Sequence, residues 1–172
     1  MILENGGALS GSLRAENGFM WRCVTDTVMG GVSTGRVART VIDHRPALRM
    51  TGDVSLRNNG GFVQIVLDLA SNGTAFDASR FQGLSLLLRG NGAGYNIHLR
   101  SPDMDRVWQS WRYSFKAPQD WTELRVGFAE FQPHRTDLPV KPSRLSRIGI
   151  VAIGKEMRAD LALSRLELVE VL

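Results

Sequence analysis

The chain has 172 residues, a formal net charge of +4, 43% hydrophobic residues and 22% charged residues. This profile is typical of a soluble globular protein, and the length favours one domain, residues 1–172, that needs no disulfide or metal to fold. No apolar stretch is long enough to span a membrane. The lone Cys23 cannot form an internal disulfide, which favours a reducing, cytoplasmic location. No run of five or more like charges occurs, so nucleic acid is not an expected partner.

Short runs of alternating apolar and polar residues, separated by glycine-rich turns, predict strands along most of the chain. Residues 1–17 are expected to form a loose arm or a first short strand. We expect strands at residues 19–24, 34–41, 47–56, 62–69, 84–89, 95–100, 111–116, 121–126, 148–153 and 161–171.

The remaining segments are predicted to be connections. Residues 71–82 read as a crossing connection with one helical turn near 77–80, and residues 127–144, with three prolines, as mostly irregular. The apolar parity changes within 161–171, which indicates a bulge or burial of both faces, with a helix as the alternative. So many short strands with almost no helix predict an all-β fold, a jelly-roll β-sandwich.

The glycine-rich stretch at residues 26–35 has glycine spacing like that of a phosphate-binding loop. The next residues are Arg36-Val37, so the lysine and hydroxyl that such a loop needs are missing. We therefore predict a structural strand connection, in which Asp26 and Ser33 hydrogen-bond to local amides. The structural motif comprises Trp21, Asp26, Gly30, Gly31, Ser33, Gly35, Asn59, Gly60 and Gly61.

Metal-binding and catalytic patterns are weak. His44, His98 and His134 lack ligand spacing, so no metal or cofactor is predicted. A structural calcium ion held by main-chain carbonyls stays open. No G-x-S-x-G motif occurs, and we predict a protein that is not an enzyme. A sugar hydrolase built on two carboxylates remains an alternative, because sequence alone cannot place such a pair.

Polar residues occupy alternate positions on several predicted strands. If these strands are neighbours, their side chains form one polar patch, and nearby tryptophans could offer flat apolar surfaces. Such a patch suits a sugar or an RNA base; the alternative is an ordinary solvated sheet face. The candidate ligand- or partner-binding residues are Gln64, Asn96, His98, Arg100, Trp108, Trp111 and Arg112, with Ser114 on the same face.

Several motifs together resemble the complex I intermediate-associated protein 30 family. They are W-R-C-V-T-D-T-V-M-G-G-V-S-T-G at residues 21–35, N-N-G-G-F-V-Q at 58–64, F-Q-G-L at 81–84 and R-G-N-G-x-x-Y-x-x-x-L-R at 89–100, with a later pair, Trp121 and Phe131. The resemblance covers nearly the whole chain. It implies a galactose-binding-domain-like jelly roll, similar in shape to carbohydrate-binding modules.

The resemblance also implies a function. Mitochondrial members of that family act as assembly chaperones for respiratory complex I, the NADH:ubiquinone oxidoreductase, and the family offers no catalytic residues to transfer. The chain shows no transit-like leader, which indicates a bacterial member. We expect a non-catalytic domain that binds a protein partner, with complex I subunits or assembly intermediates as candidates. Carbohydrate binding through the polar sheet face is the alternative, and RNA binding or sugar hydrolysis are weaker ones.

Overall fold

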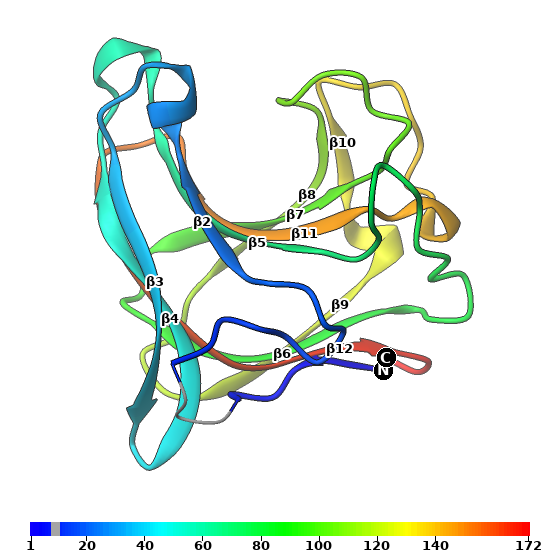
Figure 1. The fold of residues 1–172 in the computed structure, drawn as a ribbon, viewed down its shortest axis with the longest axis horizontal. Coiled ribbons are helices and arrows are strands. Elements are labelled where there is room, and N and C mark those ends of the chain that lie inside the picture. Colours follow the sequence, from blue (N-terminus) through cyan, green and yellow to red (C-terminus); the bar gives the residue numbers. More distant parts are fainter. Residues whose placement is uncertain (8–10) are drawn as a thin grey trace.

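The computed structural model describes residues 1–7 and 11–172, and within them the chain is mostly β-strand (Figure 1). The strands are β1 (Ile2–Glu4), β2 (Arg22–Thr25), β3 (Thr34–Ile42), β4 (Arg45–Val54), β5 (Phe62–Asp68), β6 (Gly83–Gly90), β7 (Gly94–Arg100), β8 (Ser110–Lys116), β9 (Thr122–Gly127), β10 (Gln132–His134), β11 (Arg147–Ile153) and β12 (Met157–Val169). Four short 3-10 helices join them: η1 (Asp26–Met29), η2 (Arg57–Asn59), η3 (Phe128–Glu130) and η4 (Pro142–Arg144).

The strands form two antiparallel sheets packed face to face. The lower sheet of Figure 1 has the order β3-β4-β12-β6-β9, with β1 also paired to β12. The upper sheet has the order β10-β8-β7-β11-β5-β2. Its upper side is curved, and segments rise from it at both ends (Figure 1). The predicted jelly-roll β-sandwich is therefore confirmed.

The core lies between the sheets and follows the predicted alternation. Val63, Ile65 and Leu67 of β5 all face inward and are fully buried, as their shared parity indicates. Trp21, Trp111 and Tyr95 are the largest fully buried side chains of the described core. Burial of each large aliphatic side chain contributes roughly 1.5–3 kcal/mol, which is why the alternation determines the sheet face so strongly.

Most predicted strands are confirmed, with two differences, at residues 77–80 and at β10. The C-terminal segment is a strand, and its register shifts between Leu163 and Arg165, so the bulge is confirmed and the helix is wrong. No helical turn forms near 77–80; instead the Asp77 carboxylate accepts a hydrogen bond from the Ser79 amide. The short strand β10 lies inside the segment expected to be irregular. Its Pro133 lacks an N–H, which explains its place at a sheet edge.

The N-terminal segment is tied down, not loose. The buried Glu4 carboxylate accepts a hydrogen bond of 2.8 Å from Trp21 Nε1 and pairs with the Arg39 guanidinium. Both charged side chains are almost inaccessible to solvent. Arg39 also donates to the carbonyl oxygens of Ser12 and Arg14. This buried ion pair fixes β1 and the chain before β2 against the lower sheet.

Candidate functional site

The solvent side of the upper sheet collects the polar residues that the sequence singled out. We call it the cationic face. Strand register places Arg112 of β8 opposite His98 of β7, and His98 opposite Gly149 of β11. One step along, Ser114 lies opposite Asn96, and its hydroxyl donates a hydrogen bond of 2.6 Å to the Asn96 side chain. The predicted patch on neighbouring strands therefore forms, with β11 inserted between β7 and β5.

The insertion of β11 separates Gln64 from the other predicted residues. Gln64 lies opposite Val151 of β11, which in turn lies opposite Asn96. The centre of the face is closely packed: Val66 and Val151 are nearly inaccessible although they face outward. A Cβ placed on Gly149 would lie 3.3 Å from Gln64 Oε1. The centre of the floor is thus filled, and its accessible surface comes from the longer side chains around it.

Arg100 acts on the protein itself. Its Nη1 donates to three backbone carbonyl oxygens, those of Arg106, Val107 and Gln109, at 3.1, 2.6 and 2.9 Å. These bonds hold residues 101–109 as a wall at the end of β7. A second brace is the ion pair of Arg144 with Asp103, whose Nε–Oδ2 distance is 3.1 Å.

The two predicted tryptophans have opposite environments. Trp111 is 1% exposed, and its Nε1 donates to the Leu138 carbonyl oxygen at 2.9 Å. The prediction that its ring offers a stacking surface is therefore wrong, because the alternation that turns Arg112 outward turns Trp111 inward. Trp108 lies on the wall held by Arg100 and is 51% exposed. Of the two rings, only that of Trp108 can contact a ligand.

His98 lies partly buried beneath the charged side chains. Its Nε2 is inaccessible to solvent and has no hydrogen-bond partner among the residues that the structure describes. Burial, and then the positive charges of Arg112, His134 and Arg100, lower the pKa of His98 from 6.5 to about 3. His98 is therefore neutral at pH 7, which keeps a further positive charge out of this region.

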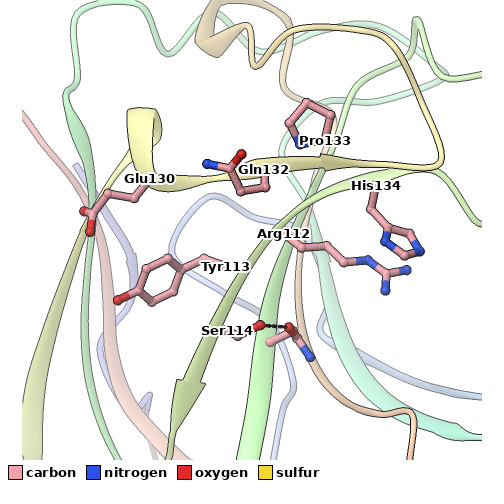
Figure 2. Close-up of a pocket in the computed structure, with 8 residues that line it drawn as sticks. Arg112, Tyr113, Ser114, Glu130, Gln132, Pro133 and His134 are labelled. Atoms are coloured by element: carbon pink, nitrogen blue, oxygen red, sulfur yellow. Dashed lines mark hydrogen bonds between the residues drawn. The ribbon is translucent and has the colours of Figure 1, made fainter.

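A depression at the β8–β10 end contains residues that the sequence analysis missed. Gln132 of β10 lies opposite Arg112, and His134 lies opposite Ser110. Figure 2 shows the Arg112 and His134 side chains on the same side of the strands, with Tyr113 extending the other way toward Glu130. The depression is lined by Asn96, Arg112, Tyr113, Ser114, Glu130, Gln132, Pro133 and His134. The alternation of Gln132 and His134 around Pro133 was the available signal.

Arg112 has few partners in this depression. Its Nε donates to Ser110 Oγ at 2.9 Å, and it forms no ion pair within residues 1–7 and 11–172. Burial, and then the nearby Arg135, lower the pKa of Arg112; likewise burial, Arg112 and Arg135 lower the pKa of His134. Arginine nevertheless stays charged at pH 7. The terminal nitrogens of Arg112 are available to a ligand.

The opposite wall is built from both glycine-rich motifs around one buried carboxylate. Asp26 is fully buried and accepts hydrogen bonds from the Ser33 amide and hydroxyl and from the amides of Gly61 and Phe62. Burial alone would raise the pKa of Asp26, but these four bonds together lower it below its usual value. The predicted role of Asp26 and Ser33 in local hydrogen bonding is confirmed, and the second motif joins it.

Glycines surround this carboxylate because no side chain would fit. A Cβ on Gly31 or Gly60 would lie 2.3 or 2.5 Å from an oxygen of Asp26. Asn58 and Asn59 have φ values of 55° and 56°, a left-handed conformation that asparagine tolerates better than most residues. The two motifs therefore encode one wall, formed by residues 26–33 and 55–61. We call it the first wall, and we call residues 101–109 the second wall.

Both walls carry exposed aliphatic side chains. On the first wall Val28, Met29, Val32 and Leu56 are 38% to 73% exposed. On the second wall Val107 is 83% exposed beside Trp108. Half-buried Phe62 faces outward at the foot of the first wall. Apolar rims on both sides of a charged floor are a common arrangement of protein-interaction surfaces.

The described residues offer little for metal binding or catalysis. No cluster of three His, Cys, Asp or Glu side chains forms within residues 1–7 and 11–172. Asp68 is the only carboxylate that the described strands place on the cationic face, and it pairs with Arg22 and Arg147 at 2.8 and 2.7 Å. Asp68 is thus engaged by two arginines. No helix in the described part of the chain is long and apolar enough to cross a membrane.

This β-sandwich with an open, walled sheet face has the fold of carbohydrate-binding modules. It is similar to the family 11 module of the cellulase Lic26A-Cel5E of Clostridium thermocellum, with a TM-score of 0.73 at 11% identity over 98% of this chain and 93% of that one. The same organism's family 11 module in complex with a β-1,3-1,4-mixed-linked tetrasaccharide has a TM-score of 0.70 at 13% identity, over 100% of this chain and 98% of that one. The family 30 module of its cellulase Cel9D-Cel44B has a TM-score of 0.65 at 12% identity, over 100% of this chain and 99% of that one.

Residues 12–164 match the family described as Complex I intermediate-associated protein 30 (CIA30). The chain belongs to this family, which confirms the resemblance carried by its motifs. No curated protein matches it in sequence.

Proposed function

We propose that this chain is a non-catalytic, cytoplasmic protein-binding domain that holds a partner on the cationic face during assembly of respiratory complex I. The observation that carries the proposal is the cationic face itself. It is an open floor between two walls, each braced by a side chain that binds backbone groups, Asp26 on one side and Arg100 on the other. Such a preorganised surface binds without first ordering its loops. Membership of the CIA30 family supports complex I intermediates as the partner.

The exposed rims also favour a protein. Val28, Met29 and Val107 are aliphatic and well exposed, and aliphatic surface pairs with the apolar side chains of another protein. Sugars bind mainly through aromatic platforms and hydrogen bonds. The centre of the described face holds Val66, Gly149 and Val151 instead of a tryptophan or tyrosine.

The test compares two charge reversals on opposite faces of the sandwich. Arg112→Glu changes the cationic face, and Arg158→Glu changes an exposed arginine on the solvent side of the lower sheet. Each variant, with an affinity tag, would be used to capture partners from the native cell, with identification by mass spectrometry. Native gels would follow complex I in a deletion strain complemented with each variant.

We expect wild type and Arg158→Glu to recover complex I subunits and restore assembly, and Arg112→Glu to do neither. Equal recovery by both variants would exclude the cationic face as the binding site. No complex I subunit with wild type, together with normal complex I in the deletion strain, would exclude the assembly role.

Carbohydrate binding is the second candidate, and the exposed Trp108 ring favours it. If a sugar stacks on that ring, Trp108→Ala should lower the affinity for the sugar and Arg112→Gln should leave it unchanged. A glycan array without binding would exclude this function.

A further inference from the structure

The two solvent-facing sheet surfaces differ in charge balance. The described strands place Arg22, Arg100, Arg112, Lys116 and Arg147 on the cationic face, against the single carboxylate of Asp68. On the lower sheet, arginines have local acidic partners: Arg49 with Asp160, Arg125 with Glu123 and Arg165 with Glu167. The lower sheet thus carries several carboxylates among its outward arginines, whereas the described strands of the cationic face supply one carboxylate for five cations.

The unbalanced charges lie toward the β8 edge of that face. Arg22 and Arg147 share Asp68, and Arg100 is engaged by backbone carbonyls. Arg112 and Lys116, two rungs apart on β8, have no acidic partner within the described residues. Half-buried Arg112 also lies near the positive charge of Arg135, and an anionic ligand would relieve the repulsion between these two cations.

The surroundings of these cations limit the kind of anion. Residues 101–109 form a wall beside the face, and the first wall rises at its far end (Figure 1). A flat membrane surface cannot reach Arg112 between them. Single-stranded RNA binds on stacked aromatic platforms, whereas the described rims are mainly aliphatic, with Val28, Met29, Val32 and Leu56 on one side and Val107 beside Trp108 on the other.

We infer that the partner presents an extended acidic segment with aliphatic side chains, which crosses the cationic face. Its carboxylates lie at Arg112 and Lys116, and its aliphatic side chains pack on Val107 and Trp108 of the second wall. Arg112 suits this role, because a guanidinium can donate two parallel hydrogen bonds to one carboxylate. This inference rests on the proposed function and names the chemical class of the partner's binding segment.

The probes are four short, fluorescein-labelled ligands of matched length, and the readout is fluorescence anisotropy with the full chain. They are a peptide alternating glutamate and leucine with glycine spacers, the same peptide with every glutamate replaced by glutamine, oligouridylate and an oligoglucuronate. We expect the acidic peptide to bind, and the glutamine peptide to bind at least about tenfold more weakly. The affinity of the acidic peptide should fall as the salt concentration is raised.

The variants locate the binding site. Arg112→Gln should weaken the acidic peptide about tenfold, which corresponds to about 1.4 kcal/mol. Trp108→Ser should weaken it severalfold, and the matched Arg158→Gln on the lower sheet should leave it unchanged. Heat denaturation of each variant checks that the fold is intact.

The other outcomes overturn either the inference or the proposed function on which it rests. Equal binding of the glutamine peptide would remove the role of charge, and tighter binding of oligouridylate or oligoglucuronate would assign the face to that polymer instead. If no peptide binds while complex I subunits are still captured in an Arg112-dependent way, the acidic segment is wrong and the proposed function stands. If the acidic peptide binds at Arg112 but no complex I subunit is captured, the proposed partner is wrong.

Discussion

The Asp26 carboxylate accepts a hydrogen bond of 2.6 Å from the backbone N–H of Gly61, although 35 residues separate them. This bond joins the two sequence motifs that mark the family. It also explains their glycines, since Gly31 and Gly60 lie where any Cβ would meet the same carboxylate.

Asp26→Asn should destabilise the fold rather than change binding alone. The new amide would direct N–H groups at the donors of Gly61 or Ser33, and the loss of several hydrogen bonds to a buried charge should cost about 3 kcal/mol or more. Urea unfolding measures this loss. Asp77→Asn, at an exposed turn carboxylate, is the control and should shift stability far less. Similar losses in both variants would contradict the special role of Asp26.

Arg100→Met should loosen residues 101–109 and leave the sheet intact. Three carbonyl oxygens would lose their donor, and amide hydrogen exchange in this segment should accelerate. The global stability should fall by about 1–3 kcal/mol. The control is Arg22→Met, which removes a half-exposed ion pair with Asp68 and should cost less than about 1 kcal/mol. Unchanged exchange in residues 101–109 would show that other contacts hold the wall.

Arg39→Met should be among the most destabilising single changes. It leaves the Glu4 carboxylate buried without its guanidinium, a situation that typically costs about 3–5 kcal/mol. Adding Glu4→Gln should restore part of the loss. The partly exposed pair of Arg49 with Asp160 supplies the comparison, because Arg49→Met should cost less than about 1 kcal/mol. The thermal unfolding midpoints of the three variants and of wild type check the order.

His98 should make the protein less stable as the solution becomes acidic. Because its pKa is lowered from 6.5 to about 3 in the fold, the unfolded chain binds the proton more readily, and stability declines as pH falls from 6.5 toward 3. The slope from this one group approaches about 1.4 kcal/mol per pH unit. His98→Gln should flatten the dependence of the unfolding free energy on pH in that window. Parallel curves for the two proteins would show that His98 is not responsible.

Gly149→Leu should block the cationic face with little change in stability. The nearest atom to a new Cβ is the flexible end of Gln64, at 3.3 Å, and Val66 and Val151 follow at the ordinary contact distances of 3.5 and 3.6 Å. A leucine therefore reaches the surface by displacing the Gln64 side chain. Partner capture should fall strongly while the unfolding midpoint stays close to that of wild type. Thr51→Leu adds similar bulk on the solvent side of the lower sheet and should capture normally. Full capture by Gly149→Leu would place the partner elsewhere.

Alternation within each strand made the sheets and much of the face predictable. Asn96, His98 and Arg100 share one parity of β7, and Ile97 and Leu99 share the other, so burial follows directly from the residue types. The same rule places Trp111 in the core, because it precedes the outward-facing Arg112 by one residue. By contrast, β11 is a run of apolar residues, and alternation could not show that Gly149 and Val151 face outward.

Interactions between segments that are distant in sequence could not be predicted from the sequence. Nothing in the local sequence around Arg100 indicates that its guanidinium binds the carbonyls of the next loop, since any arginine on that parity looks available to a ligand. The meeting of Asp26 with Gly61 likewise depends on the pairing of β2 with β5. Pairing partners of that kind are set by the whole topology, and the residues of either strand alone do not specify them.

The bonds of Arg100 go to main-chain oxygens, and every amino acid supplies one. Residues 106 and 107 can therefore exchange their side chains while the wall keeps its path, whereas the Gln109 side chain also accepts a hydrogen bond from the Arg106 amide. An engineer could diversify these positions around a constant arginine, much as a library varies loops on an antibody framework. Natural selection has the same freedom, so recognition by this rim can be retargeted without rebuilding the scaffold beneath it.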